Sequence, residues 1–166
     1  MKKSIAFNLK PTGNEIAKVG EKGKRFLKSH GLSDDSVQKQ IMVVRELIKS
    51  GITFENQKHA VNEMSVHIYI EENTVTTEIR KPVNESTHNH QLEALDKTIQ
   101  WIRGHQDPFT PFMIEAWQTS ESSGNNGFNS FGLAKIAYKT GAILDFYVSE
   151  DNILNLSAVS HVNGDH

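Results

Sequence analysis

Hydrophobic and polar residues alternate along three parts of the chain, which is the pattern of strands with one buried face. Residues 4–9 fit an edge strand that ends at the Pro-Thr-Gly turn of positions 11–13. Two similar hairpins follow at 65–79 and 143–159, each with acidic and Asn residues at the turn between runs rich in β-branched and aromatic residues. The pattern therefore predicts one edge strand and two hairpins.

Other segments repeat their apolar residues every three or four positions, as amphipathic helices do. The clearest begins after Ser33, an N-cap residue followed by two acids, and it continues until Gly51. Gly20 and Gly23 weaken the prediction for the first helix, because glycine disfavours helix interiors. We expect helices at 14–29, 33–50, 90–103, 112–118 and 131–140.

Paired strands that alternate with helices favour an α+β fold. We expect a two-layer α/β sandwich, in which a mixed, mainly antiparallel sheet carries its helices on one face. With 166 residues, 37% of them hydrophobic, the chain is expected to form a single domain over 1–166 with a core of its own.

Composition excludes several classes of function. The chain has no cysteine, so a disulfide framework, a thiolate metal site and a cysteine nucleophile are impossible. Its formal charge of −2 gives no general attraction to nucleic acid or to an anionic membrane. The first apolar patch ends at Asn8 after three residues, so we expect neither a signal peptide nor a membrane span, and a cytoplasmic location.

A tract rich in Ser, Gly and Asn at 120–130 leads directly into an apolar helix. Free N–H groups and the positive end of the dipole at such a helix start suit a phosphate group. Nucleotide binding is therefore the first hypothesis. The tract is neither a GxGxxG motif nor a P-loop, and a plain connector between two elements is the alternative.

Three segments occur in the order and with the spacing of a known family: VVRELIKSGITF at 43–54, SVHIYIEENTVTTEIRKPVNE at 65–85 and GNNGFNSFGLAKIA at 124–137. The layout resembles the histidine-kinase-like ATPase family (GHKL, or Bergerat fold), in particular its branch of small anti-sigma factors and serine kinases. In that branch a helix bears Glu and, four residues later, Asn. A hairpin then ends in Asp-x-Gly-x-Gly, and a glycine-containing lid precedes another helix and a closing hairpin.

The resemblance assigns roles to positions of this chain, and several of those positions hold a different residue. Glu46 matches the catalytic Glu of the family, which orients water, but Ser50 replaces the magnesium-binding Asn. Lys81 takes the place of the adenine-reading Asp, and Val83 and Glu85 replace the two glycines that follow it. A lysine cannot accept a hydrogen bond from the exocyclic amine of adenine. In the lid, Gly132 matches the last glycine of the family and Ser130 replaces an earlier one, while Gly124 and Gly127 are candidate hinges. The candidate nucleotide-binding residues are therefore Ser50, Lys81, Gly124, Gly127, Ser130 and Gly132.

The resemblance and these departures together favour a regulatory protein that acts by binding a protein partner, with lost or atypical nucleotide binding. The partner would be of the sigma-factor or antagonist type, and a homodimer is a further option that the family suggests. We expect no cofactor, no metal, no nucleic acid and no membrane as ligand. Two alternatives stay open: an active serine kinase or anti-sigma factor that uses ATP and Mg²⁺, and a small-ligand enzyme that uses the equivalent pocket.

Two further groups of residues are candidates with plainer explanations. His88 and His90 stand two apart, and could join a metal site or be exposed loop histidines. Segment 104–130 contains several aromatic residues, and it predicts a mobile lid with apolar anchors in a protein-binding face. Trp101 and Trp117 are expected to be core or lid-packing groups.

Overall fold

The computed structural model describes residues 2–10, 12–54, 63–121 and 130–162. Its sheet has the strand order β1-β2-β3-β5-β4, and each of the four pairings is antiparallel. The strands are β1 Lys2–Leu9, β2 Met64–Glu71, β3 Thr74–Pro82, β4 Ile143–Val148 and β5 Ile153–His161. Both predicted hairpins lie in this one sheet, and the predicted edge strand is β1.

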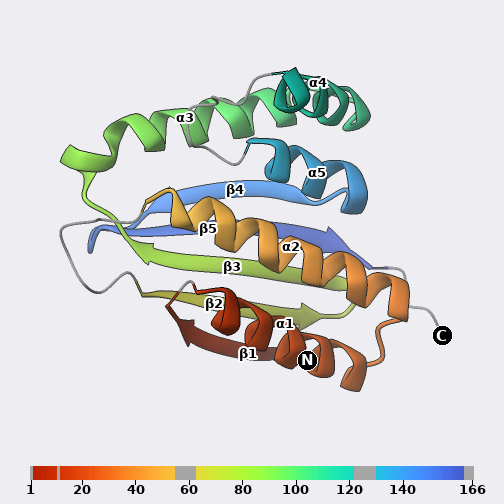
Figure 1. The fold of residues 1–166 in the computed structure, drawn as a ribbon. Coiled ribbons are helices and arrows are strands. Elements are labelled where there is room, and N and C mark those ends of the chain that lie inside the picture. Colours follow the sequence, from red (N-terminus) through yellow and green to blue (C-terminus); the bar gives the residue numbers. More distant parts are fainter. Residues whose placement is uncertain (1, 11, 55–62, 122–129, 163–166) are drawn as a thin grey trace.

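The helices lie on one face of the sheet, as expected from the sequence (Figure 1). They are α1 Gly13–Ser29, α2 Asp34–Ile52, α3 Glu85–Arg103, α4 Phe109–Glu121 and α5 Ser130–Thr140. The α+β prediction of a two-layer sandwich is confirmed, and the sheet expected to be mixed is antiparallel throughout the described strands. None of the helices in the described part of the chain has the length and hydrophobicity that crossing a membrane requires.

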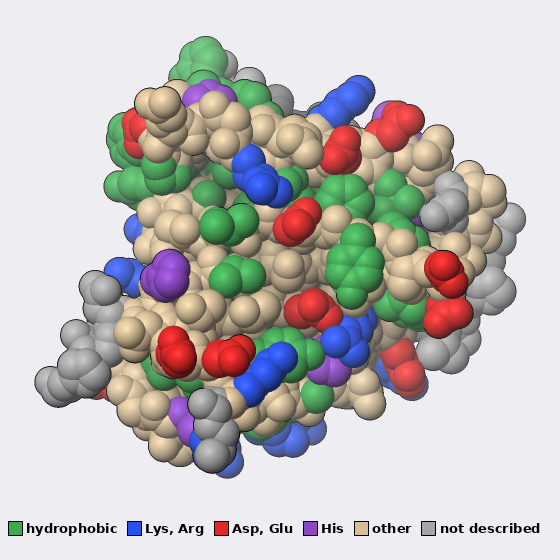
Figure 2. Space-filling model, turned by 180° about the vertical axis from the view of Figure 1, so that it is seen from behind, with side chains coloured by type: hydrophobic (Ala, Val, Ile, Leu, Met, Phe, Trp, Pro, Cys, Tyr) green, Lys and Arg blue, Asp and Glu red, His purple; other side chains and the backbone are tan. Residues whose placement is uncertain are grey.

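The core fills the space between this helix layer and the covered face of the sheet. Alternate residues of the central strands point into it, so that Ile68, Ile79 and Leu156 are fully buried. From above, α2 contributes Leu47 and Ile48, which are also fully buried. None of the described helices lies on the opposite face of the sheet, and this is the face turned to the viewer in Figure 2.

Close helix packing explains the glycines that weakened the first helix prediction. A Cβ atom on Gly23 would lie 3.2 Å from Ile41 of α2 and 3.3 Å from Ile68 of the sheet. Gly51 is tighter, since its Cβ would come within 2.7 Å of Ile79. Glycine here lets α1 and α2 approach their neighbours, and tertiary packing outweighs the helix propensity.

Two helices are longer than the periodicity predicted. The first turns of α3 are polar, so their start is marked only by the cap, where the side chain of Asn84 accepts a hydrogen bond from the Ser86 N–H at 3.0 Å. Helix α4 begins at Phe109 and not at 112, with Asp107 Oδ1 accepting from the Phe109 N–H at 2.9 Å. The earlier start adds Phe109 to the helix, one turn before Met113.

Candidate functional site

The C-terminal half of α2 holds Glu46 and Ser50, and both are buried. Glu46 Oε1 lies 3.4 Å from the ammonium nitrogen of Lys49 on the same helix and 4.0 Å from that of Lys135 on α5. Ser50 Oγ donates a hydrogen bond to the backbone carbonyl of Glu46 at 3.1 Å. The Glu46 carboxylate thus links α2 with α5. The Ser50 hydroxyl donates its proton to a backbone carbonyl of its own helix.

Lys81 lies on the covered face of β3, where only 2% of its surface is exposed. Ile79, its neighbour on that face, sits beneath Gly51, so Lys81 lies at the same end of the helix layer as Ser50. Past the strand, the Val83 N–H donates to the Asn152 carbonyl at 2.9 Å, which ties this segment to the β4–β5 turn. Lys81, which stands where the resembled family has Asp, is therefore buried in the fold, and the chain just after it is hydrogen-bonded to a neighbouring turn.

His88 belongs to the same polar region and is buried in the first turns of α3. Its Nδ1 accepts a hydrogen bond from the Asn84 N–H at 2.9 Å, and its ring packs edge-on to Phe54 at 5.8 Å. Burial lowers the pKa of His88, and the positive charge of Lys81 lowers it further. The plainer expectation of an exposed loop histidine is wrong for His88, because this ring caps a helix and fills space.

The lid positions are only partly described. Ser130 begins α5, and its hydroxyl donates to Glu115 Oε2 on α4 at 2.8 Å. Gly132 is buried in the first turn of α5. Gly124 and Gly127 lie outside the described residues, so the anion-binding prediction for the tract stays a prediction.

The polar cluster at this end of the helix layer consists of Glu46, Ser50, Lys81, His88 and Lys135. It combines the side chains of two lysines, one glutamate, one serine and one histidine, and the pKa of that histidine is lowered. An ammonium group only donates hydrogen bonds, whereas a site that reads the exocyclic amine of adenine needs an acceptor. Among the described residues no three His, Asp or Glu side chains group as a metal site would require.

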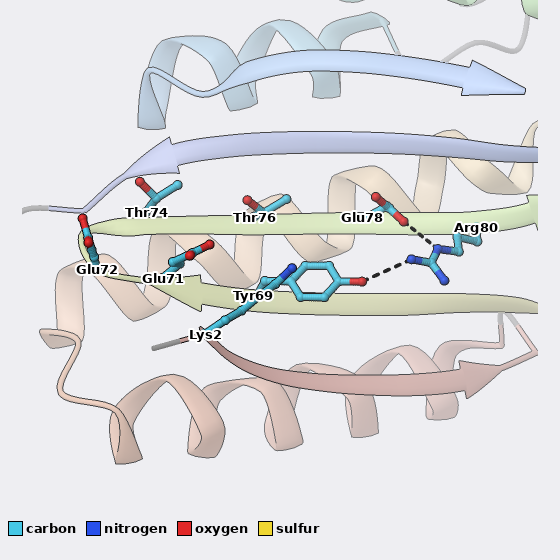
Figure 3. Close-up of a pocket in the computed structure, with 8 residues that line it drawn as sticks. All are labelled: Lys2, Tyr69, Glu71, Glu72, Thr74, Thr76, Glu78 and Arg80. Atoms are coloured by element: carbon cyan, nitrogen blue, oxygen red, sulfur yellow. Dashed lines mark hydrogen bonds and ion pairs between the residues drawn. The ribbon is translucent and has the colours of Figure 1, made fainter.

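A hollow of about 600 Å³ lies on the uncovered face of the sheet, at the end where β2 turns into β3 (Figure 3). Arg80 lies at the end of this group that is remote from the turn, with Nε 2.6 Å from Glu78 Oε1 and Nη2 3.2 Å from the Tyr69 hydroxyl. The Lys2 ammonium lies 4.2 Å from the centre of the Tyr69 ring. Its lining residues are Lys2, Tyr69, Glu71, Glu72, Thr74, Thr76, Glu78 and Arg80.

His67 lies beside this hollow, with its ring stacked on Tyr69 at 6.1 Å and an interplanar angle of 11°. Burial lowers the pKa of His67, the charge of Arg80 lowers it further, and Glu78 opposes both. The lining is polar and contains the Arg80–Glu78 ion pair. Nothing in the sequence marked this surface in advance, because its residues only come together through the strand register.

A third feature is an apolar stripe on α4, which we define as Phe109, Met113, Ile114 and Trp117. These side chains are 42%, 47%, 38% and 64% exposed. Figure 2 shows hydrophobic side chains gathered at the upper left corner, where α4 lies in that view. Trp101 packs, half-buried, against the core, whereas Trp117 is mostly exposed and is not a core residue. Packing of Trp117 on the lid stays a prediction, because most of the lid lies outside the described residues. The sequence analysis expected apolar anchors in this segment, and the earlier start of α4 adds Phe109 to them.

Comparison of the sequence with known protein families and with curated proteins finds no match. The fold, however, is similar to that of a chain in the crystal structure of the SiaB-SiaC complex from Pseudomonas aeruginosa, with a TM-score of 0.68 and 16% sequence identity. The alignment covers 95% of this chain and 89% of that one. At this identity the likeness concerns the fold, and it covers the whole α+β arrangement.

Proposed function

We propose that this protein is a regulatory protein of the anti-sigma or switch-kinase type, built on the histidine-kinase-like ATPase fold, which acts by binding a protein partner. Nucleotide binding of the family kind is lost or altered in it. The observation that carries the proposal is the buried Lys81, which puts a hydrogen-bond donor where the resembled family places its adenine-reading acceptor.

The metal position supports the same proposal. Phosphoryl transfer relies on positioning and on a metal that neutralises developing charge. Ser50 offers a shorter side chain than Asn and no amide carbonyl, and its hydroxyl proton is engaged with the Glu46 carbonyl. A site without its adenine acceptor and without its metal amide is poorly suited to transfer phosphate from ATP.

Partner binding is supported by the fold that this chain shares with a chain of the SiaB-SiaC complex, which is an assembly of two named proteins. For this chain we propose a partner of the sigma-factor or antagonist type and a cytoplasmic location. The partner's identity is a matter for capture experiments with the purified chain as bait, followed by reconstitution from purified components.

One observation favours the alternative of an ATP-dependent serine kinase. Glu46 is retained and buried at the position of the catalytic Glu, next to Lys135 of the helix that follows the lid. Its ion pairs with Lys49 and Lys135 also explain its presence structurally, as a link between α2 and α5.

Isothermal titration with ATP and MgCl₂ separates the two. We expect no binding tighter than about 1 mM, which corresponds to a binding free energy of only about −4 kcal/mol. Binding in the micromolar range, or transfer of labelled phosphate to a serine peptide or to the chain itself, would contradict the proposal and favour the kinase.

Three variants test the role of Lys81 and Ser50 in the titration. The double variant Lys81→Asp with Ser50→Asn restores both family residues and is expected to gain affinity for ATP. Lys39→Asp with Ser36→Asn makes the same exchange of residue types on exposed or half-buried positions of α2 and serves as the control. Because an aspartate at the buried position 81 can disturb folding, Lys81→Met, which keeps an apolar stem, is titrated beside them and is expected to fold without binding ATP.

A further inference from the structure

A pocket of about 240 Å³ lies at the opposite end of the helix layer from Lys81. It is formed where α2 begins, where α5 ends and where β5 ends, and these three places meet at the right-hand side of Figure 1. Gln40 of α2 lines the pocket, and the helix from Gln40 to Ser50 spans about 15 Å. The pocket is therefore distinct from the position at which the resembled family binds ATP.

The side-chain amide of Gln40 is the feature of this pocket that points to a ligand. The residue is only 2% exposed, and its Oε1 atom has no hydrogen-bond partner among the described residues. A buried acceptor that loses its water and gains no partner costs free energy, so such atoms are rare in folded proteins. The torsion of a terminal amide is soft, which lets this oxygen meet a donor that enters the pocket. The pocket therefore suits a ligand that brings a hydrogen-bond donor.

The ammonium groups of Lys39 and Lys139 give the pocket an excess of positive charge. Asp35, the acid in the lining, offsets one of them, since its Oδ2 lies 3.0 Å from the Lys39 ammonium nitrogen. Within the described part of the chain, Lys139 makes no ion pair. The dipoles of the two helix ends that meet here have opposite signs and offset one another, so the side chains decide the charge. An ammonium group without a counter-charge in a partly enclosed pocket attracts a carboxylate.

The size of the pocket and its remaining hydroxyl narrow the choice of ligand. Thr140 is already engaged, because its hydroxyl donates to the Ile136 carbonyl at 2.6 Å and accepts from the Ala142 N–H at 3.0 Å. A water molecule takes about 30 Å³ in the liquid, so a volume of about 240 Å³ corresponds to about eight waters. A ligand of roughly eight to ten non-hydrogen atoms fills such a space.

We propose that this pocket binds a small organic acid of that size, which carries a hydroxyl or amino group next to a carboxylate. Lys139 holds the carboxylate, and the neighbouring hydroxyl or amino group donates a hydrogen bond to Gln40 Oε1. This inference goes beyond the proposed function, because it assigns a small-ligand site remote from Lys81 and depends neither on ATP nor on the protein partner.

Isothermal titration of the full chain with three matched acids tests the proposal. Succinate, L-malate and L-aspartate share a four-carbon dicarboxylate skeleton and differ at C2, which bears hydrogen, a hydroxyl or an ammonium group. We expect malate or aspartate to bind at least about fivefold more tightly than succinate, because succinate leaves the buried acceptor unpaired. The tighter binder of the two tells whether the natural ligand is a hydroxy acid or an amino acid. NaCl keeps the ionic strength constant, since salt screens exposed charges.

Two variants separate the roles of the amide and of the ammonium group. Gln40→Met removes the acceptor and keeps the length of the side chain, so we expect malate and aspartate to bind no better than succinate does. Gln38→Met, at an exposed position of the same helix, is its control and should keep the difference. Lys139→Gln is expected to weaken binding of all three acids several-fold, because a charge-assisted hydrogen bond is lost. Lys97→Gln, at an exposed position of α3, is the control for this change.

Circular dichroism melting shows whether each variant is folded. Gln40→Met is expected to melt no lower than the unmodified chain, because it replaces an unpartnered buried amide with an apolar side chain. Lys139→Gln changes an exposed side chain, and so it tests the site even if position 40 does not tolerate methionine.

Four results would overturn the proposal. They are no saturable heat with any of the three acids up to about 20 mM, equal affinities for the three acids in the unmodified chain, a preference for malate or aspartate that survives in Gln40→Met, and unchanged binding in Lys139→Gln. None of these results bears on the titration with ATP, so the two proposals fail independently.

Discussion

Helices α2 and α4 both carry apolar residues at helical spacing, but they differ in what covers them. Ten residues of α2 are buried, because the sheet lies beneath it and α1 and α5 lie beside it. Helix α4 packs chiefly on α5 and leaves Met113 and Ile114 partly exposed. We therefore expect the apolar face of α2 to stabilise the fold far more than the exposed side chains of α4 do.

The largest expected effect comes from one substitution made in both helices. Ile48→Ala in α2 removes a fully buried side chain and should lower the free energy of unfolding by about 2–5 kcal/mol, because a cavity is left in a packed core. Ile114→Ala in α4 removes a side chain that is partly exposed already, and we expect a loss below about 1 kcal/mol.

Urea unfolding followed by circular dichroism measures both values under the same conditions. Equal losses for the two variants would show that α4 is as much a part of the core as α2, and the comparison between the helices would no longer hold.

A smaller effect is expected in the pH dependence of stability. The pKa of His88 is lowered from 6.5 in the folded chain, so between the two values the unfolded chain binds more protons than the folded one. The free energy of unfolding therefore falls as the pH drops below about 6.5 and levels off below the folded pKa. His67 acts in the same direction.

His88→Gln keeps an acceptor for the Asn84 N–H and removes the titrating group. Unfolding curves measured at several pH values between about 7.5 and 5.5, the range in which histidine titrates, should show a shallower loss in this variant. Addition of His67→Gln should make the loss shallower still. A pH dependence unchanged in His88→Gln would mean that this ring is protonated as easily in the folded chain as in the unfolded one.

Most of the fold follows from the sequence, because several local signals agree with it. Alternation marked both hairpins, and the Ser33 cap with its two acids marked the start of α2. The start of α3 was hidden because its first turns are polar and do not show apolar periodicity. Gly23 weakened the prediction of the first helix, and Gly51 marked the end of the second. Both allow close approach to Ile68 and Ile79, respectively, which only the tertiary structure reveals.

The candidate sites were predictable to a smaller extent. Position in the chain was enough to match Glu46, Ser50 and Lys81 to a family pattern, but the contact of Glu46 with Lys135 joins residues far apart in the sequence. The hollow around Arg80 depends on the register of β2 and β3. Burial of His88 depends on a helix start that no periodicity marked.

The central claim is that the buried Lys81 removes ATP binding of the family kind, and calorimetric titration with ATP and MgCl₂ tests it most directly. The unmodified chain and the double variant Lys81→Asp with Ser50→Asn are titrated under the same conditions. The account predicts no binding tighter than about 1 mM for the unmodified chain and a gain of affinity in the double variant. Micromolar binding of ATP by the unmodified chain would contradict it.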